Sequence, residues 1–166
     1  MLSIGIGADV LYLKAQGEMR AGTCFALGEF LGPYLEKVRK KIIIMLDLSE
    51  CSYMDSTFIG FIISLARKCE KYFPERVEIV NPSPRCEAIL EKLCCMSTLA
   101  IVHGGALPEV SLFELEPPAH AFGSRTNVEL MFRAHKSLSE LSEENRQAFR
   151  ELLDELKGVM GGGTGG

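Results

Sequence analysis

Residues 42–60 read IIIMLDLSECSYMDSTFIG, and their pattern indicates a strand followed by a helix. Residues 42–48 form an apolar run, interrupted by Asp47, that is rich in β-branched side chains and typical of a strand covered on both faces. From Phe58 onward apolar residues recur at helical spacing and form two adjacent stripes, which predicts a helix buried over a wide arc. The stretch therefore predicts a central strand that leads into a buried helix.

The segments before this stretch predict two strands and a helix. Residues 2–6 and 10–15 have the composition of short strands, joined by a turn at residues 7–9. Residues 26–38 carry apolar side chains at helical spacing and end in a group of cationic residues, which suits the end of a helix. The pair Gly32-Pro33 is expected to kink or delay this helix.

The segments after it continue the alternation of strand and helix. Residues 76–80 and 99–102 are predicted strands, and residues 85–95 are a predicted helix. The whole order predicts an α/β fold with a single mixed sheet of about five strands and helices packed on it. We assign this domain to residues 1–104.

The composition of the sequence changes after residue 104. Residues 114–119 (ELEPPA) combine acidic residues with two prolines, which are not expected to continue a regular element, so residues 105–123 are a predicted linker. Residues 124–158 form a predicted C-terminal helical extension, and residues 159–166 a flexible Gly-rich tail. The extension carries an apolar stripe that could pack on the sheet, mediate a homodimer or recruit another protein: Leu141, Phe149, Leu152, Leu153 and Leu156.

Composition narrows the class of protein. A hydrophobic content of 47% and a charged content of 24% are those of a globular protein with one core. A net charge of −4 offers no basic surface for nucleic acid. No signal peptide is evident and the longest apolar run is too short to span a membrane, so we expect a cytoplasmic protein without membrane insertion. The six cysteines include no CxxC pair and are expected to be reduced and buried.

Residues 45–60 (MLDLSECSYMDSTFIG) resemble the hallmark of the STAS domain family. In that family a buried strand ends in an LDLS-like tetrapeptide, and a D-S-S/T element then opens a helix. A Gly17-Glu18 element and an asparagine-proline loop at residues 81–82 also agree with the family. The resemblance covers residues 2–102, and it implies a STAS-like fold.

The resemblance implies an anti-sigma factor antagonist. In such proteins the serine matching Ser56 is phosphorylated by a partner kinase that is itself the anti-sigma factor. The unphosphorylated protein binds that serine kinase and frees a sigma factor, and a phosphatase would be a further partner. ATP belongs to the kinase, so no cofactor and no enzymatic activity are expected here. The resemblance places partner binding at Asp55, Ser56, Thr57 and Phe58, although many members have glycine where this chain has Phe58.

The residues themselves leave other interpretations open. Asp55-Ser56-Thr57 has the composition of a helix cap, and Thr57 is either an alternative phosphorylation site or a hydroxyl that satisfies the first turn. A Ser56 hydroxyl at the rim of the sheet would be reachable by a kinase. The domain could instead be an unphosphorylated scaffold, or an accessory or sensor module in a signalling or transporter complex, with a ligand groove between sheet and extension.

The same residues do not favour catalysis or metal binding. A nucleophilic serine or cysteine needs a base beside it, and no histidine lies near Ser56 in the sequence. His103, His120 and His135 are scattered without ligand spacing, so no metal site is predicted.

Overall fold

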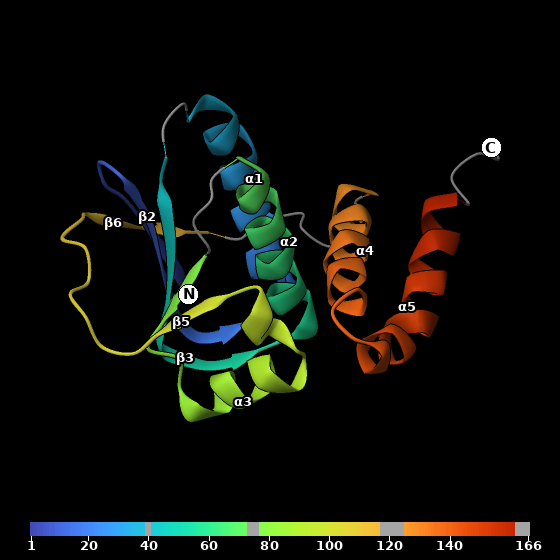
Figure 1. Ribbon diagram of the computed structural model, residues 1–166. Helices are drawn as coiled ribbons and strands as arrows, with labels where there is room; N and C mark the ends of the chain where they lie inside the picture. Colours follow the sequence, from blue (N-terminus) through green and yellow to red (C-terminus); the bar gives the residue numbers. More distant parts are fainter. Residues whose placement is uncertain (39–40, 73–76, 117–124, 162–166) are drawn as a thin grey trace.

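One mixed sheet carries the fold (Figure 1). The computed structural model describes residues 1–38, 41–72, 77–116 and 125–161. The strands lie in the order β5-β4-β3-β2-β1-β6, in which β2 to β5 run parallel and β1 is antiparallel to both of its neighbours. They are β1 (Leu2–Ile6), β2 (Val10–Met19), β3 (Ile43–Met54), β4 (Glu78–Val80), β5 (Ala100–Val102) and β6 (Leu112–Leu115). The predicted α/β architecture with a mixed sheet is confirmed.

The helices form successive layers beside the sheet (Figure 1). Helices α1 and α2 lie against it, α4 packs on α2, and α5 packs on the side of α4 that faces away from the sheet. The bounds are α1 (Ala21–Lys37), α2 (Ser56–Tyr72), α3 (Pro84–Lys92), α4 (Arg125–Ser139) and α5 (Glu143–Gly161), with a short 3-10 turn at Cys95–Ser97. The predicted extension is therefore a pair of helices, the α4–α5 hairpin (residues 125–161), that packs on α2 rather than on the sheet.

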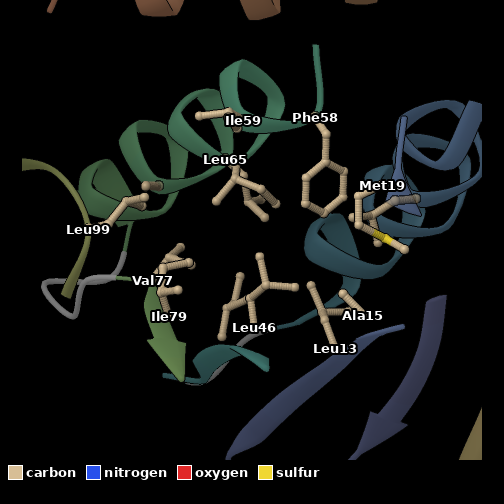
Figure 2. Packing of buried hydrophobic residues seen from close by; sticks show 14 of the residues in the cluster. Leu13, Ala15, Met19, Leu46, Phe58, Ile59, Leu65, Val77, Ile79 and Leu99 are labelled. Atoms are coloured by element: carbon tan, nitrogen blue, oxygen red, sulfur yellow. The ribbon is translucent and has the colours of Figure 1, made fainter. Parts of the chain in front are cut away.

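The core lies between the sheet and α2. Figure 2 shows Phe58 and Leu65 of α2 pointing toward side chains of the strands. Phe58 and Leu13 are fully buried, and Leu46 is 1% exposed. At about 25 cal/mol per Å² of apolar surface, each such side chain stabilises the fold by roughly 1.5–3 kcal/mol relative to its exposed state. The strand and helix predicted from residues 42–69 thus form the centre of the core.

Strand β2 extends further than predicted and reaches the start of α1. Its pairing with β3 shifts register on both sides of Gly17, which has a φ of +72° that side chains other than glycine rarely adopt. The bulges let the strand continue through Glu18 to Met19, so α1 begins at Ala21 instead of residue 26. Helix α1 then runs to Lys37 with Pro33 inside it, where a kink or delayed start was predicted.

The range predicted as a linker, residues 105–123, contains a strand. Strand β6 pairs antiparallel with β1, from Leu2 opposite Leu115 to Gly5 opposite Leu112. The expectation that ELEPPA would contain no regular element is wrong for its first two residues, because pairing with β1 supplies partners that the local sequence does not reveal. Residues 117–123 lie outside the described residues. Helix α5 continues to Gly161, three residues into the range predicted as a flexible tail, and residues 162–166 are again outside.

Candidate functional site

The candidate site lies where β2 and β3 end and α1 and α2 begin. Because β2 and β3 are parallel, their carboxyl ends meet at the same edge of the sheet. The backbone N–H of Asp55 donates to the carbonyl of Met19 over 3.0 Å and holds the two strand-to-helix junctions together. Loops and helix N-termini at this edge are where α/β sheets usually place functional groups.

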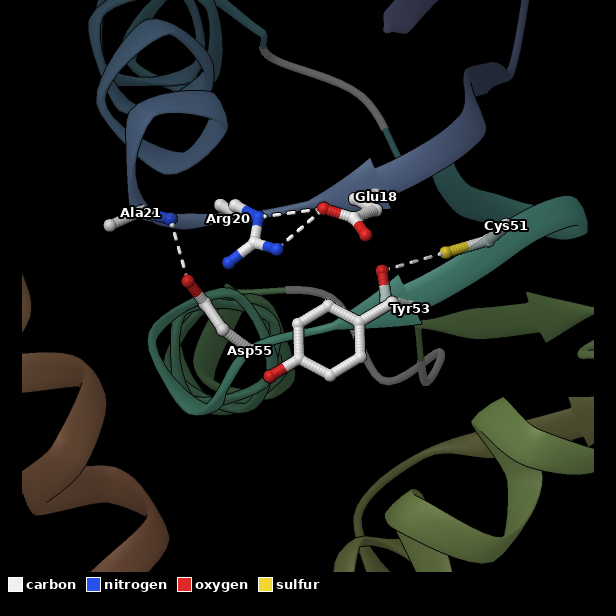
Figure 3. Close-up of polar contacts among 6 residues, drawn as sticks. All are labelled: Glu18, Arg20, Ala21, Cys51, Tyr53 and Asp55. Atoms are coloured by element: carbon white, nitrogen blue, oxygen red, sulfur yellow. Dashed lines mark hydrogen bonds and ion pairs between the residues drawn. The ribbon is translucent and has the colours of Figure 1, made fainter.

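Asp55 caps both helices with one carboxylate. Its Oδ1 accepts a hydrogen bond from the backbone N–H of Phe58 at 2.8 Å, and its Oδ2 accepts one from Ala21 at 3.0 Å, the latter drawn in Figure 3. The first N–H groups of a helix have no partner within the helix, so a carboxylate there satisfies them and suits the positive end of the helix dipole. Asp55, which was expected to contact a partner, thus uses both of its carboxylate oxygens to cap the two helices.

Ser56 is the first residue of α2 and contacts the C-terminal extension. Its Oγ lies 3.0 Å from Nε2 of His135 on α4, and Nδ1 of His135 lies 2.9 Å from the carbonyl oxygen of Met131. A carbonyl only accepts, so in the neutral imidazole Nδ1 carries the proton and Nε2 accepts from the Ser56 hydroxyl. His135, which is 79 residues away in sequence, is the functional neighbour that sequence reasoning missed.

His135 is held in its neutral form. Its side chain is 2% exposed, and burial lowers its pKa, although the Met131 carbonyl and the charge of Asp55 oppose that effect. The Phe149 ring of α5 lies 5.3 Å from the imidazole, measured between ring centroids. The imidazole is therefore enclosed between α2 and α5 and acts as a hydrogen-bond acceptor for Ser56.

Thr57 and Phe58 do not lie at the surface. Ser56 is half-buried, whereas Thr57 is 5% exposed and Phe58 is fully buried. Successive residues of a helix point about 100° apart, so when position 56 faces outward position 58 faces the core. The expectation that Phe58 forms part of the partner surface is therefore corrected: its ring belongs to the core shown in Figure 2.

Two arginines flank Tyr53 at the same edge. The guanidinium carbons of Arg20 and Arg85 lie 5.3 and 5.5 Å from the centre of its ring, within the range of a cation–π contact. Arg20 also donates to Glu18 through Nε at 2.9 Å (Figure 3). This edge of the sheet thus carries an aromatic ring between two arginines, one of which is paired with Glu18, and no sequence motif indicated this cluster.

Asp47 of the LDLS-like tetrapeptide has a structural role. It is fully buried, and it accepts hydrogen bonds from the Tyr12 hydroxyl at 2.5 Å and from the backbone N–H of Ser49 at 2.9 Å. Burial, and then the hydrogen bond to Asp47, raise the pKa of Tyr12 above its ordinary value. This pair joins β2 to β3 just before the site and fixes the path of the strand that delivers Ser56.

The remaining side chains with ligand chemistry are dispersed. Among the described residues, no three histidine, cysteine or acidic side chains come together in a way that could hold a metal ion. His103 lies 3.3 Å from Glu87, whereas His120 is outside the described residues. All six cysteines are free and five are buried, but Cys94 is exposed, contrary to the expectation that all would be buried.

A groove of about 690 Å³ lies between α1, α2 and the extension. Its lining combines apolar side chains from α1 and α2 with two cations and two acids: Phe25, Leu31, Leu65, Lys68, Arg133, Glu29 and Glu129. No helix in the described part of the chain has the length and apolar character that a membrane span requires.

Comparison with solved structures supports the fold. The chain is similar to a structure described as the anti-sigma factor antagonist SpoIIAA in its unphosphorylated form, with a TM-score of 0.55 and 14% sequence identity. The match covers 61% of this chain and 88% of that one. No family model matches the chain, and no curated protein does. At this identity the likeness shows the fold alone, and it confirms the STAS-like α/β fold that the sequence predicted.

Proposed function

We propose that the chain is an anti-sigma factor antagonist, a partner switch controlled by phosphorylation of Ser56. The observation that carries this proposal is the position of the Ser56 hydroxyl, on the first residue of α2 and directly after the capping Asp55. The STAS-like fold and the likeness to a structure of an anti-sigma factor antagonist support it. The unphosphorylated form binds an anti-sigma factor serine kinase and thereby frees a sigma factor.

The chemistry belongs to the kinase. The Ser56 oxygen attacks the γ-phosphorus of ATP bound by the kinase, the bond from that phosphorus to ADP breaks, and the hydroxyl proton leaves to a base of the kinase. A phosphatase would return the serine to its free form. In this proposal the chain itself is a substrate and a binding partner, not an enzyme, and His135 orients and covers the serine rather than activating it.

Phosphorylation changes the surface more than the fold. A phosphoserine carries about −1.5 to −2 charges near neutral pH. The positive end of the α2 dipole stabilises an anion at this position by about 0.3–1 kcal/mol. The same charges lie beside Asp55 and resist desolvation in an interface. If they cost about 3–4 kcal/mol of binding free energy, affinity for the kinase falls by roughly a few hundredfold, because each 1.4 kcal/mol is tenfold.

The test is to incubate the purified chain with an anti-sigma-type kinase of its own organism and ATP, and to locate added phosphate by peptide mass spectrometry. We expect one phosphate, on Ser56. It should be absent from Ser56→Ala and retained in Thr57→Ala, because Thr57 is buried. Modification that persists in Ser56→Ala, or none at all with a kinase active on another substrate, would count against the proposal.

The groove beside the extension favours a second candidate, a sensor module for a small molecule. Its apolar side chains, with charged groups of both signs around them, would suit an apolar molecule with a polar group. A ligand that binds only the native state raises the melting temperature, and above its dissociation constant the stabilisation grows with the logarithm of its concentration. A screen of apolar metabolites that carry a polar group by thermal shift, repeated on Lys68→Ala, separates specific binding from general stabilisation.

The partner proposal also covers assembly and location. Such a switch works in the cytoplasm, where free cysteines stay reduced. A homodimer through the extension stays a prediction that sedimentation at several protein concentrations can check.

A further inference from the structure

The contact between Ser56 and His135 places α4 over the serine that the proposed function requires to be free. With the hydroxyl donating to a buried imidazole at 3.0 Å, the proton that a base of the kinase must accept is already held in a hydrogen bond to α4. The half-buried Ser56 therefore lies at the edge of α4, and a kinase that needs its hydroxyl competes with the hairpin for it.

The fit between α2 and α4 is close along the same face. Gly60, one helical turn after Ser56, lies so near α4 that a methyl group there would be 2.3 Å from the carbonyl oxygen of Ala134. Further along, Arg67 of α2 pairs with Glu140, just after α4, at 2.6 Å. This face of α2 is thus already occupied by a segment of the same chain.

The cover has few deep anchors. In α4 four residues are buried, Ala134, His135, Leu138 and Ser139, whereas in α5 burial is limited to Asn145 and Leu156. The Arg67–Glu140 pair is partly exposed, and such pairs contribute about 0–1 kcal/mol. A unit held by few buried apolar contacts opens at lower free energy than the sheet does.

We propose that the face of α2 formed by Ser56 and Gly60 is the docking surface for the kinase partner, and that the α4–α5 hairpin is its intramolecular occupant. The proposal rests on the proposed function and adds its regulation. The partner binds only the form in which the hairpin has moved away. If the covered form outnumbers the open form tenfold, the apparent affinity for the partner falls about tenfold.

The first arm of the test measures opening without any partner. Amide hydrogen exchange is followed in the full chain and in Gly60→Ala, with Gly32→Ala as the matched control, since a methyl group at Gly32 meets nothing within 4 Å. We expect α4 and α5 to exchange faster than β3 in the wild type, and Gly60→Ala to accelerate them at least tenfold while β3 and the control stay unchanged. Hairpin amides that exchange only together with those of β3 would overturn the proposal.

A second variant protects the test if Gly60→Ala folds poorly. Arg67→Glu places two carboxylates side by side at the contact with residue 140, and Arg67→Glu with Glu140→Arg restores an opposite-charge pair. Exchange of the hairpin should rise several-fold in the single variant and return in the double variant. No rise in the single variant, or no return in the double, contradicts the proposal.

The second arm measures the initial rate of Ser56 phosphorylation by the kinase at saturating ATP. The proposal expects Arg67→Glu, which lies outside the face formed by Ser56 and Gly60, to be phosphorylated faster than the wild type by the factor seen in exchange, and Gly32→Ala to match the wild type. Equal rates in all three proteins would contradict the proposal that the hairpin covers the docking face. They would not contradict the proposed function. No phosphate on Ser56 in any of them would overturn the proposed function, and hydrogen exchange alone would then decide whether the hairpin opens.

Discussion

The Oγ of Ser56 and the Nε2 of His135 lie 3.0 Å apart, although 79 residues separate them in the chain. Through this hydrogen bond the helix-opening motif and the C-terminal extension share one polar contact. Whatever changes the protonation of His135 or the charge at Ser56 therefore acts on both parts at once.

Lowering the pH should destabilise the fold through His135. Its pKa is lowered in the folded chain, so below about pH 6.5 the unfolded chain binds a proton that the folded chain resists, and the free energy of unfolding falls as the pH drops. Between pH 7.5 and 5.5 the loss can reach at most about 1.4 kcal/mol, a ceiling set by the roughly one pH unit between the ordinary pKa of histidine and pH 5.5. Urea unfolding at both pH values measures it.

The matched variant for this prediction is His135→Gln, which keeps an acceptor near Ser56 but does not titrate. Between the two pH values its free energy of unfolding should fall less than that of the wild type. The difference between the two proteins is the contribution of His135. Equal losses would mean that His135 titrates alike in both states.

Removing the Asp55 carboxylate should weaken both helix starts. Asp55→Ala leaves the N–H groups of Ala21 and Phe58 without their acceptor, and we expect a loss of about 2 kcal/mol in urea unfolding, because each lost cap costs about 0.5–2 kcal/mol. Asp55→Asn keeps one acceptor oxygen of the two and should lose less. Identical losses in the two variants would show that the hydrogen bond retained in Asp55→Asn contributes nothing to stability.

Tyr12→Phe should destabilise the junction of β2 and β3. It removes the hydroxyl that donates to the buried Asp47, and hydrogen bonds to charged groups contribute about 1.5–3 kcal/mol. Because the pKa of Tyr12 is raised in the folded chain, the unfolded tyrosine ionises first above about pH 10, and stability falls as the pH rises further. Unfolding measured at pH 9 and 11 should show a smaller alkaline loss in Tyr12→Phe, whose other tyrosines still titrate.

Thiol labelling of the native chain should modify Cys94 first. Cys94 is exposed, whereas the other five cysteines are buried. Burial also raises the pKa of Cys69 to about 11 and that of Cys95 to about 12, so neither forms much of the reactive thiolate at neutral pH. Peptide mass spectrometry after brief treatment with N-ethylmaleimide checks this, with Cys94→Ser as the control that should remain unlabelled.

The centre of the fold could be predicted from the sequence because its signals are local. The apolar run of β3 and the stripes of α2 depend on neighbours a few residues apart, and they place Ser56 at the start of a helix without further information. The start of α1 could not be predicted in this way. Its cap is the carboxylate of Asp55, 34 residues further on, so Arg20 and Ala21 carry no capping signal of their own.

The surroundings of Ser56 depended on contacts between distant segments. His135 reaches the serine only because α4 packs on α2, and a close approach at Gly60 has no trace in hydrophobic periodicity. The burial of Phe58 agrees with the apolar stripe that begins at this residue, whereas the resemblance had placed its ring in the partner surface. Strand β6 has mostly exposed side chains, so it lacks the alternation that marks a half-buried strand.

Strand β6 also decides which strand ends the sheet on that side. A chain cut at residue 104 would leave β1, whose first four residues are buried, with a row of backbone groups open to another copy. Long apolar edges of this kind template aggregation, whereas short edges with charged residues resist it. Strand β6 pairs with that edge and leaves a border strand of four residues (LFEL) in which Leu112 and Phe113 are each 44% exposed and Glu114 is the one acidic residue. Solubility of the isolated domain should require residues up to Leu115, because they cover the longer, buried edge of β1.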